Sequence, residues 1–165
     1  MEKITALKEL HIEILRDLYN AEVLTVSELL YFKKQVHQSE LKELVHNYLY
    51  DSRAHITTLE EVLNSLKASL LEEHCRTMKS IILESKKLVE RCSEGHIRDL
   101  AIITSLQRMN TCKISAYKAL IKLTVRPSNG QNLQRLQYIL KHETQMEEAL
   151  DNIATENINL KQPAS

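Results

Sequence analysis

Long stretches without glycine or proline are the feature that most limits how this chain can fold. The 165 residues contain two glycines and two prolines, and none of these four occurs before Gly95. Both prolines, Pro127 and Pro163, lie at a connection or near the end of the chain. Because glycine and proline break helices, and because sheet proteins need many tight turns, the pattern predicts an all-α protein. An apolar content of 43% with one phenylalanine and no tryptophan is typical of a bundle packed through leucine and isoleucine.

Apolar residues recur every three or four positions along five segments, which is the spacing of one helix face. The expected helices cover residues 4–36, 39–67, 77–92, 96–125 and 131–157. Four of them are long, and the short one lies in the connection between the second and the fourth. A bundle of simple hairpins would not need that extra segment, so the pattern predicts a four-helix bundle with a helical crossover.

Polar and turn-forming residues mark the ends of these helices. Ser39 is expected to be the N-cap of the second helix. Residues 68–76 blur the apolar spacing and are expected to form a connection that is partly helical. Residues 93–95, Ser-Glu-Gly, break the pattern before the fourth helix, and residues 126–130, RPSNG, form the clearest break in the chain.

The size and charge of the chain limit the kinds of protein that it can be. The length suits one domain, which we place at residues 1–160, followed by a loose tail over residues 161–165. Lysine plus arginine and aspartate plus glutamate balance at 22 each, so the chain lacks the positive excess of a dedicated nucleic-acid binder. No run approaches the roughly 18 apolar residues of a membrane span, and the start does not resemble a signal peptide. We therefore expect a cytoplasmic protein without nucleic-acid or membrane partners, and with free, reduced thiols at Cys75, Cys92 and Cys112.

Several apolar stripes are interrupted near their middles by polar residues that are costly to bury. These residues are Glu22, Asp51, His55, Asn110, Lys113, Glu143 and Glu147. Antiparallel helices of similar length place their middles at one height, so the interruptions are expected to converge on a shared polar centre. Carboxylates and an imidazole on facing helices are ligands that iron, manganese or zinc accept. The simpler interpretation is that each is a boundary residue with its polar end in water.

Five segments resemble the YciE/YciF-type family of ferritin-like stress proteins. Leu15 to Glu22, LRDLYNAE, is similar to the family's LxDxYxAE signature, and Leu44 to Val62 is similar to its HLEET and IERL-like run. Gly95 to Ala101, Gln107 to Leu120 and Leu140 to Ala154 match later family segments with consistent spacing. The resemblance covers nearly the whole chain. It implies a ferritin-like bundle, a stress-associated cytosolic role and a dimeric rather than cage-forming assembly.

The resemblance also implies which positions correspond to the family's metal ligands. Glu22 keeps the first-helix carboxylate, Asp51 stands in for a second-helix glutamate, and His55 takes a position where the family has glutamine or histidine. Glu143 and Glu147 keep the acids of the last helix. These five residues are the candidate metal ligands.

The fourth helix departs from the family pattern. Where the family has two glutamates three residues apart, this chain has Asn110 and Lys113. An ammonium close to a divalent metal ion repels it, and at low dielectric this repulsion weakens binding of the ion by several kcal/mol. We therefore expect Lys113 to pair with Glu22, Glu143 or Glu147 in a buried salt-bridge network that replaces the metal. The alternative is that the Lys113 amine reaches water along the core edge.

Two functions follow from these alternatives. The first is a non-catalytic, stress-associated structural or interaction protein that binds no metal. The second is a metal-binding stress protein or oxidase that holds one iron, manganese or zinc ion, or a dinuclear iron or manganese centre. No serine-histidine-aspartate order, phosphate-binding loop or HExxH motif occurs, so hydrolase and nucleotide-binding classes have no support. Tyr19, Tyr48 and Tyr117 are candidate redox neighbours of an oxidase site, but tyrosines between helices are more often packing residues with wetted hydroxyls, which is what we expect here.

A homodimer is the expected assembly, and no other protein partner can be named from the sequence. Long helices with leucines at outer positions have more apolar surface than one stripe can bury. The leucines in question are Leu24, Leu30, Leu49 and Leu63, which are also placed to cover the short helix.

Overall fold

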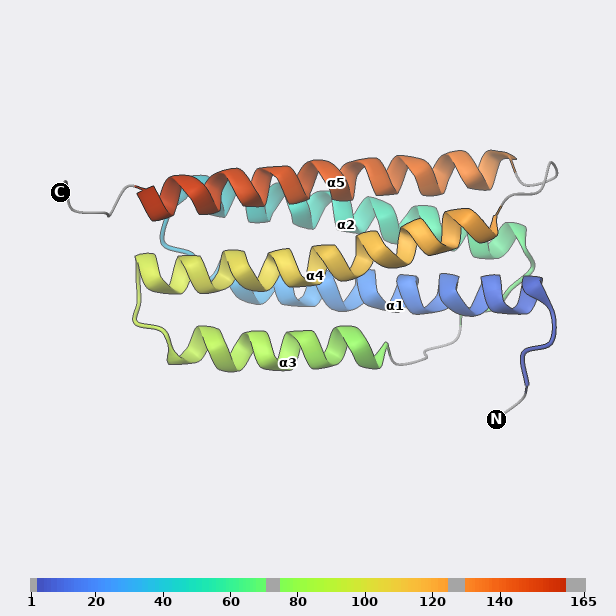
Figure 1. Ribbon diagram of the computed structural model, residues 1–165, viewed down its shortest axis with the longest axis horizontal. Coiled ribbons are helices and arrows are strands. Elements are labelled where there is room, and N and C mark those ends of the chain that lie inside the picture. Colours follow the sequence, from blue (N-terminus) through green and yellow to red (C-terminus); the bar gives the residue numbers. More distant parts are fainter. Residues whose placement is uncertain (1–2, 71–74, 125–129, 160–165) are drawn as a thin grey trace.

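The computed structural model describes residues 3–70, 75–124 and 130–159, and helices form almost all of this part of the chain (Figure 1). The helices are α1 (Leu7–Lys33), α2 (Ser39–Ser65), α3 (Arg76–Arg91), α4 (His96–Leu123) and α5 (Gly130–Asn159). The described ranges contain no strand. The prediction of an all-α protein with four long helices and one short helix is therefore confirmed.

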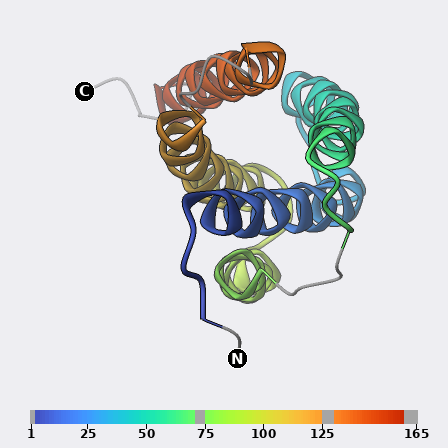
Figure 2. The same ribbon diagram turned by 90° about the vertical axis from the view of Figure 1, so that its right-hand side faces the viewer.

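The four long helices form a ring, in the order α1, α2, α5 and α4, and each is antiparallel to its neighbours (Figures 1 and 2). The short helix α3 lies outside the ring and packs on α1 and α4. It carries the chain back along the length of the bundle, so α2 and α4 run in the same direction (Figure 1). This is the expected bundle with a helical crossover.

The core consists of two apolar clusters, one on each side of the middle of the bundle. One cluster includes Phe32, Leu41 and Leu106, all fully buried. The other includes Leu15, Leu59 and further residues from the opposite halves of the same helices. Each fully buried leucine or phenylalanine stabilises the fold by about 1.5–3 kcal/mol. Together the clusters align the four helices and leave a single layer between them for polar side chains.

The second helix is capped by a residue from another helix. Gln38, not Ser39, occupies the N-cap position of α2, so the expected Ser39 cap is wrong. The buried carboxylate of Asp99 in α4 accepts hydrogen bonds from the backbone N–H groups of His37 and Gln38, both at 2.9 Å. A carboxylate suits this place because the first N–H groups of a helix have no partner within it and carry partial positive charge.

The first helix begins three residues later than expected, at Leu7 instead of Ile4. The Glu9 carboxylate accepts hydrogen bonds from the backbone N–H groups of Thr5 and Ala6, at 2.8 and 3.1 Å. Ile4 is half exposed, because the apolar stripe reaches the core only further along α1. The acid at the third helical position therefore sets the helix start.

Two of the four leucines assigned to outer positions lie in the core. Leu49 and Leu63 are buried within the monomer, which corrects that expectation. Leu30 is exposed, and Leu24 packs partly on the core. The homodimer stays a prediction.

Some sequence-based expectations fall on residues that the structure does not describe. The loose tail over 161–165 and most of the break at 126–130 lie outside the described residues, although Gly130 opens α5. The break at 93–95 is confirmed, and Gly95 has a φ of +90°, a backbone conformation that favours glycine. Among the described helices, none combines the length and apolar character needed to cross a membrane.

Replacing Asp99 with asparagine should destabilise the fold by about 1–2 kcal/mol, because α2 loses a charged cap that accepts two backbone hydrogen bonds. Urea unfolding followed by circular dichroism measures this loss. Asp151→Asn, at an exposed position, is the matched control and should change stability by less than about 0.5 kcal/mol. An unchanged midpoint in Asp99→Asn would contradict the assignment.

Candidate functional site

One acidic or basic side chain from each long helix enters the layer between the two apolar clusters. Each of the four is at most 2% exposed. They are Glu22 of α1, His55 of α2, Lys113 of α4 and Glu143 of α5. Each interrupts an apolar stripe at mid-helix, so helix packing brings all four to the same height. The expectation that such interruptions converge therefore holds for these four residues and for Asn110 of α4, which is fully buried and donates a hydrogen bond to Glu143.

Lys113 lies between two carboxylates and does not reach water. Its Nζ donates hydrogen bonds to Glu22 Oε2 at 2.8 Å and to Glu143 Oε1 at 2.7 Å. The side chain is 0% exposed, which rules out the alternative of an amine at the solvent edge. Burial alone would lower the pKa of Lys113, but the charges of Glu143 and Glu22 raise it well above its usual value. The amine is therefore held as an ammonium and is not a nucleophile.

His55 completes the charge balance of the layer. Its Nδ1 lies 3.1 Å from Glu143 Oε1 and 3.5 Å from Glu22 Oε1, close enough for ion pairing although not aligned for a hydrogen bond. Burial alone would lower the pKa of His55, but the two carboxylates raise it to about 9. Two carboxylates, one ammonium and one imidazolium leave the layer without net charge. Each buried charge therefore has an opposite charge nearby, which offsets the cost of removing it from water.

Two tyrosines and an amide satisfy the remaining carboxylate oxygens. Tyr117 donates to Glu22 Oε1 at 2.9 Å, and Tyr48 donates to Glu143 Oε2 at 3.1 Å. Asn110 Nδ2 donates to Glu143 Oε2 at 2.6 Å. Burial and the neighbouring carboxylates raise the pKa of both tyrosines, so their hydroxyls stay protonated donors. These two hydroxyls are buried, which corrects the expectation that they are wetted.

The spacing of the two tyrosines along the sequence also points to a place in this layer. Tyr48 precedes His55 by seven residues, and Tyr117 follows Lys113 by four. Both spacings place the side chains on one helix face. A tyrosine on the same helix face as a buried residue that pairs with carboxylates is therefore a candidate hydrogen-bond donor to those carboxylates, as well as a packing residue.

Two of the expected site residues lie outside this layer. Asp51 is half-buried on α2, and Glu147 is half-buried on α5, where its Oε1 accepts a hydrogen bond from Thr111 at 3.4 Å. Within the described ranges, one group of three potential metal-ligand residues occurs, namely Glu22, His55 and Glu143, whose ligand atoms lie within 4.8 Å of one another. Lys113 thus pairs with Glu22 and Glu143 but not with Glu147.

The residues of the layer do not match a dinuclear metal centre. Such a centre needs carboxylates from several helices to bridge two cations. Here α4 supplies Asn110 and Lys113, and the Lys113 ammonium already lies between the two acids that would bridge. This arrangement of residues can hold the four helices together through hydrogen bonds to charged groups.

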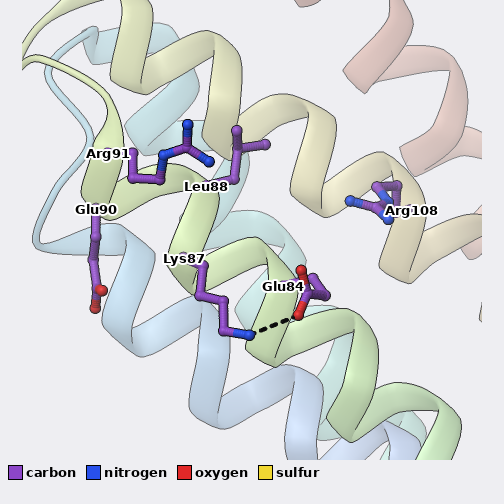
Figure 3. Close-up of a pocket in the computed structure, with 6 residues that line it drawn as sticks. All are labelled: Glu84, Lys87, Leu88, Glu90, Arg91 and Arg108. Atoms are coloured by element: carbon purple, nitrogen blue, oxygen red, sulfur yellow. Dashed lines mark hydrogen bonds and ion pairs between the residues drawn. The ribbon is translucent and has the colours of Figure 1, made fainter.

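A shallow groove of about 520 Å³ lies on the outer surface between α3 and α4 (Figure 3). Its lining consists of Glu84, Lys87, Leu88, Glu90, Arg91 and Arg108. Lys87 and Glu84 form an exposed ion pair at 2.9 Å. The lining side chains are exposed, so their charges are screened by solvent, and the groove lacks the convergent buried groups of the central layer.

Comparisons with known proteins agree with the fold. The family model described as "Domain of unknown function (DUF892)" matches residues 6–162 of this chain. A curated relative, protein YciF of Escherichia coli (strain K12), is 23% identical over 158 residues, which is 94% of each chain.

Two solved structures share the architecture. The crystal structure of the E. coli stress protein YciF matches with a TM-score of 0.90 and 22% identity, over 96% of this chain and 100% of that chain. YcfI of Rhodopseudomonas palustris, provisionally described as a structural protein, matches with a TM-score of 0.86 and 21% identity, over 91% and 96% of the two chains. These similarities confirm the resemblance that the sequence motifs indicated.

Replacing Lys113 with methionine should destabilise the protein by about 3–5 kcal/mol, because two buried carboxylates lose their cation. The charge-free variant Lys113→Met/Glu22→Gln/Glu143→Gln should be more stable than this single variant. Urea unfolding at neutral pH compares them. Lys118→Met, on the exposed face of α4, is the control and should change little. A triple variant that is less stable than the single one would argue against charge pairing as the main contribution.

Stability should fall at alkaline pH because of His55. Its pKa is raised from an unfolded value of about 6.5, so the stabilisation is complete below pH 6.5 and is lost as the pH rises through about 9. The loss is on the order of 3 kcal/mol. Urea unfolding across this range measures it. The decline should disappear in His55→Gln and persist in His46→Gln, which changes an exposed histidine. Equal slopes in these two variants would assign the decline to another group.

Proposed function

This chain belongs to the DUF892 family, and from this membership and the central layer we propose that it is a non-catalytic, stress-associated structural or interaction protein. In this proposal a buried lysine-carboxylate network takes the place that a di-metal centre has in ferritin-like proteins. The relatives named as a stress protein and as a provisional structural protein support such a role.

The observation that carries the proposal is the position of the Lys113 ammonium. It lies 2.8 and 2.7 Å from the acids of α1 and α5, where bridging ions would need the same oxygens. A divalent ion at that place would be repelled by several kcal/mol even at an effective dielectric of about 20. The ammonium supplies the positive charge that the acids need, so the bundle would hold its shape whatever the metal supply.

A second function is favoured by one specific feature, the approach of Glu22, His55 and Glu143 within 4.8 Å. These three side chains have the ligand types of a mononuclear iron, manganese or zinc site. An oxidase of this kind would oxidise iron(II) in air faster than a Glu22→Ala/Glu143→Ala variant. Equal rates of iron(II) oxidation by the unaltered protein and the variant would exclude the oxidase function. Cytoplasmic location and homodimer formation remain predictions under either function.

Protein purified without chelator should contain far less than one iron or manganese per chain by elemental analysis, because Lys113 competes for the acids. A Lys113→Glu/Asn110→Glu variant, which restores two acids to α4, should bind these ions more tightly by tenfold or more. Lys118→Glu adds an acid on the exposed face of the same helix and should not. About two ions per chain in the unaltered protein would overturn the salt-bridge proposal.

A further inference from the structure

The ring of His55 has a second nitrogen that faces away from the carboxylates. Its Nε2 lies 3.5 Å from Nδ1 of His142, and the two rings are 5.6 Å apart between centroids. His142 belongs to α5, so the pair bridges α2 and α5. The crossover helix α3 packs on α1 and α4 instead, so it leaves this seam uncovered (Figure 2).

The facing nitrogens share one hydrogen bond, and further neighbours also hold each ring in its orientation. The Nδ1 of His55 is directed inward by the acids of the central layer, at 3.1 and 3.5 Å. His142 packs on the ring of Tyr138, with centroids 4.1 Å apart. Tyr138 is 58% exposed and His142 is half-buried, so the pair extends from the buried ring of His55 toward the surface.

We propose that His55 Nε2 and His142 Nδ1 together bind one divalent transition-metal ion, of the kind of Zn²⁺ or Cu²⁺, with water completing its coordination. A tetrahedral ion with metal-nitrogen bonds of about 2.0–2.1 Å separates its ligand nitrogens by about 3.3 Å. The observed 3.5 Å is close to this value, so the two rings would need little movement. Imidazole nitrogens favour these ions over manganese or calcium.

The carboxylates of the central layer act here as outer partners of a metal-binding histidine. A carboxylate beside the far nitrogen of a ligating imidazole fixes the ring and increases its basicity. With His55 neutral, two acids and one ammonium leave the layer with one net negative charge, which favours a cation on the outer side of the ring. The ion therefore takes the place of the proton that otherwise charges His55, and that proton is released to solvent.

This site is distinct from a ferritin-like centre, because neither Glu22 nor Glu143 would touch the ion. It rests on the proposed function in one respect, namely that Lys113 stays paired with Glu22 and Glu143, so these acids do not bind the ion. The two proposals can still fail separately, because they concern different ions and different residues.

The test is calorimetric titration of the full-length, chelator-treated protein with zinc chloride. We expect one site per chain, with an affinity that falls tenfold or more in His142→Asn and stays unchanged in His46→Asn, an exposed histidine of α2. Circular dichroism checks that both variants fold. Absence of a stoichiometric site, or equal binding by His142→Asn and by Glu22→Gln, would overturn the proposal and leave the salt-bridge proposal intact. Zinc that binds equally to His142→Asn but not to Glu22→Gln would place the ion among the acids and overturn both.

A measurement without variants gives an independent check. Electron paramagnetic resonance of the protein with one equivalent of Cu²⁺ reports the nitrogen atoms bound to the ion. We expect hyperfine coupling to two imidazole nitrogens. A spectrum with one imidazole, or with none, would show that the histidine pair does not act as a unit and would overturn the proposal.

Discussion

The ion pairs between the Lys113 ammonium and the carboxylates of Glu22 and Glu143 are the interaction on which the rest of the central layer depends. Removing these charges from water costs several kcal/mol each, and mutual attraction offsets the cost only where further hydrogen bonds satisfy the remaining oxygens. Tyr117 and Tyr48 provide those bonds, and His55 balances the second negative charge. The buried hydroxyls of these tyrosines and the buried imidazole of His55 are thus explained by the pair itself.

A buried polar layer also constrains the bundle in a way that apolar packing does not. Leucine side chains tolerate small shifts between helices, whereas hydrogen bonds of 2.7–2.9 Å to charged groups do not. The layer draws one charged residue from each long helix and divides the core into two apolar clusters. We infer that it fixes the relative heights of the four helices, a role that buried polar residues have in some coiled coils.

The similarity to YciF and YcfI concerns the architecture, since identities of 21–23% over nearly the full length preserve a bundle more readily than a site. In this chain the bundle surrounds an ammonium, and a buried and a half-buried histidine meet between α2 and α5. A ferritin-like scaffold can therefore keep its internal acids while the positive charge that neutralises them comes from a side chain.

The sequence by itself determined the helices, because their apolar spacing and the scarcity of glycine and proline are local properties, and the ends were correct to within a few residues. It also indicated Glu22, His55, Lys113 and Glu143 as interruptions at matching depth. Only the tertiary structure showed that these four are buried while Asp51 and Glu147 are half-buried outside the layer, since a rotation of a few tens of degrees about a helix axis moves a side chain from the core to the surface. It alone revealed Asp99 as the cap of α2 and His142 beside His55. Such contacts join residues that are 61 or more positions apart, where no local pattern carries information.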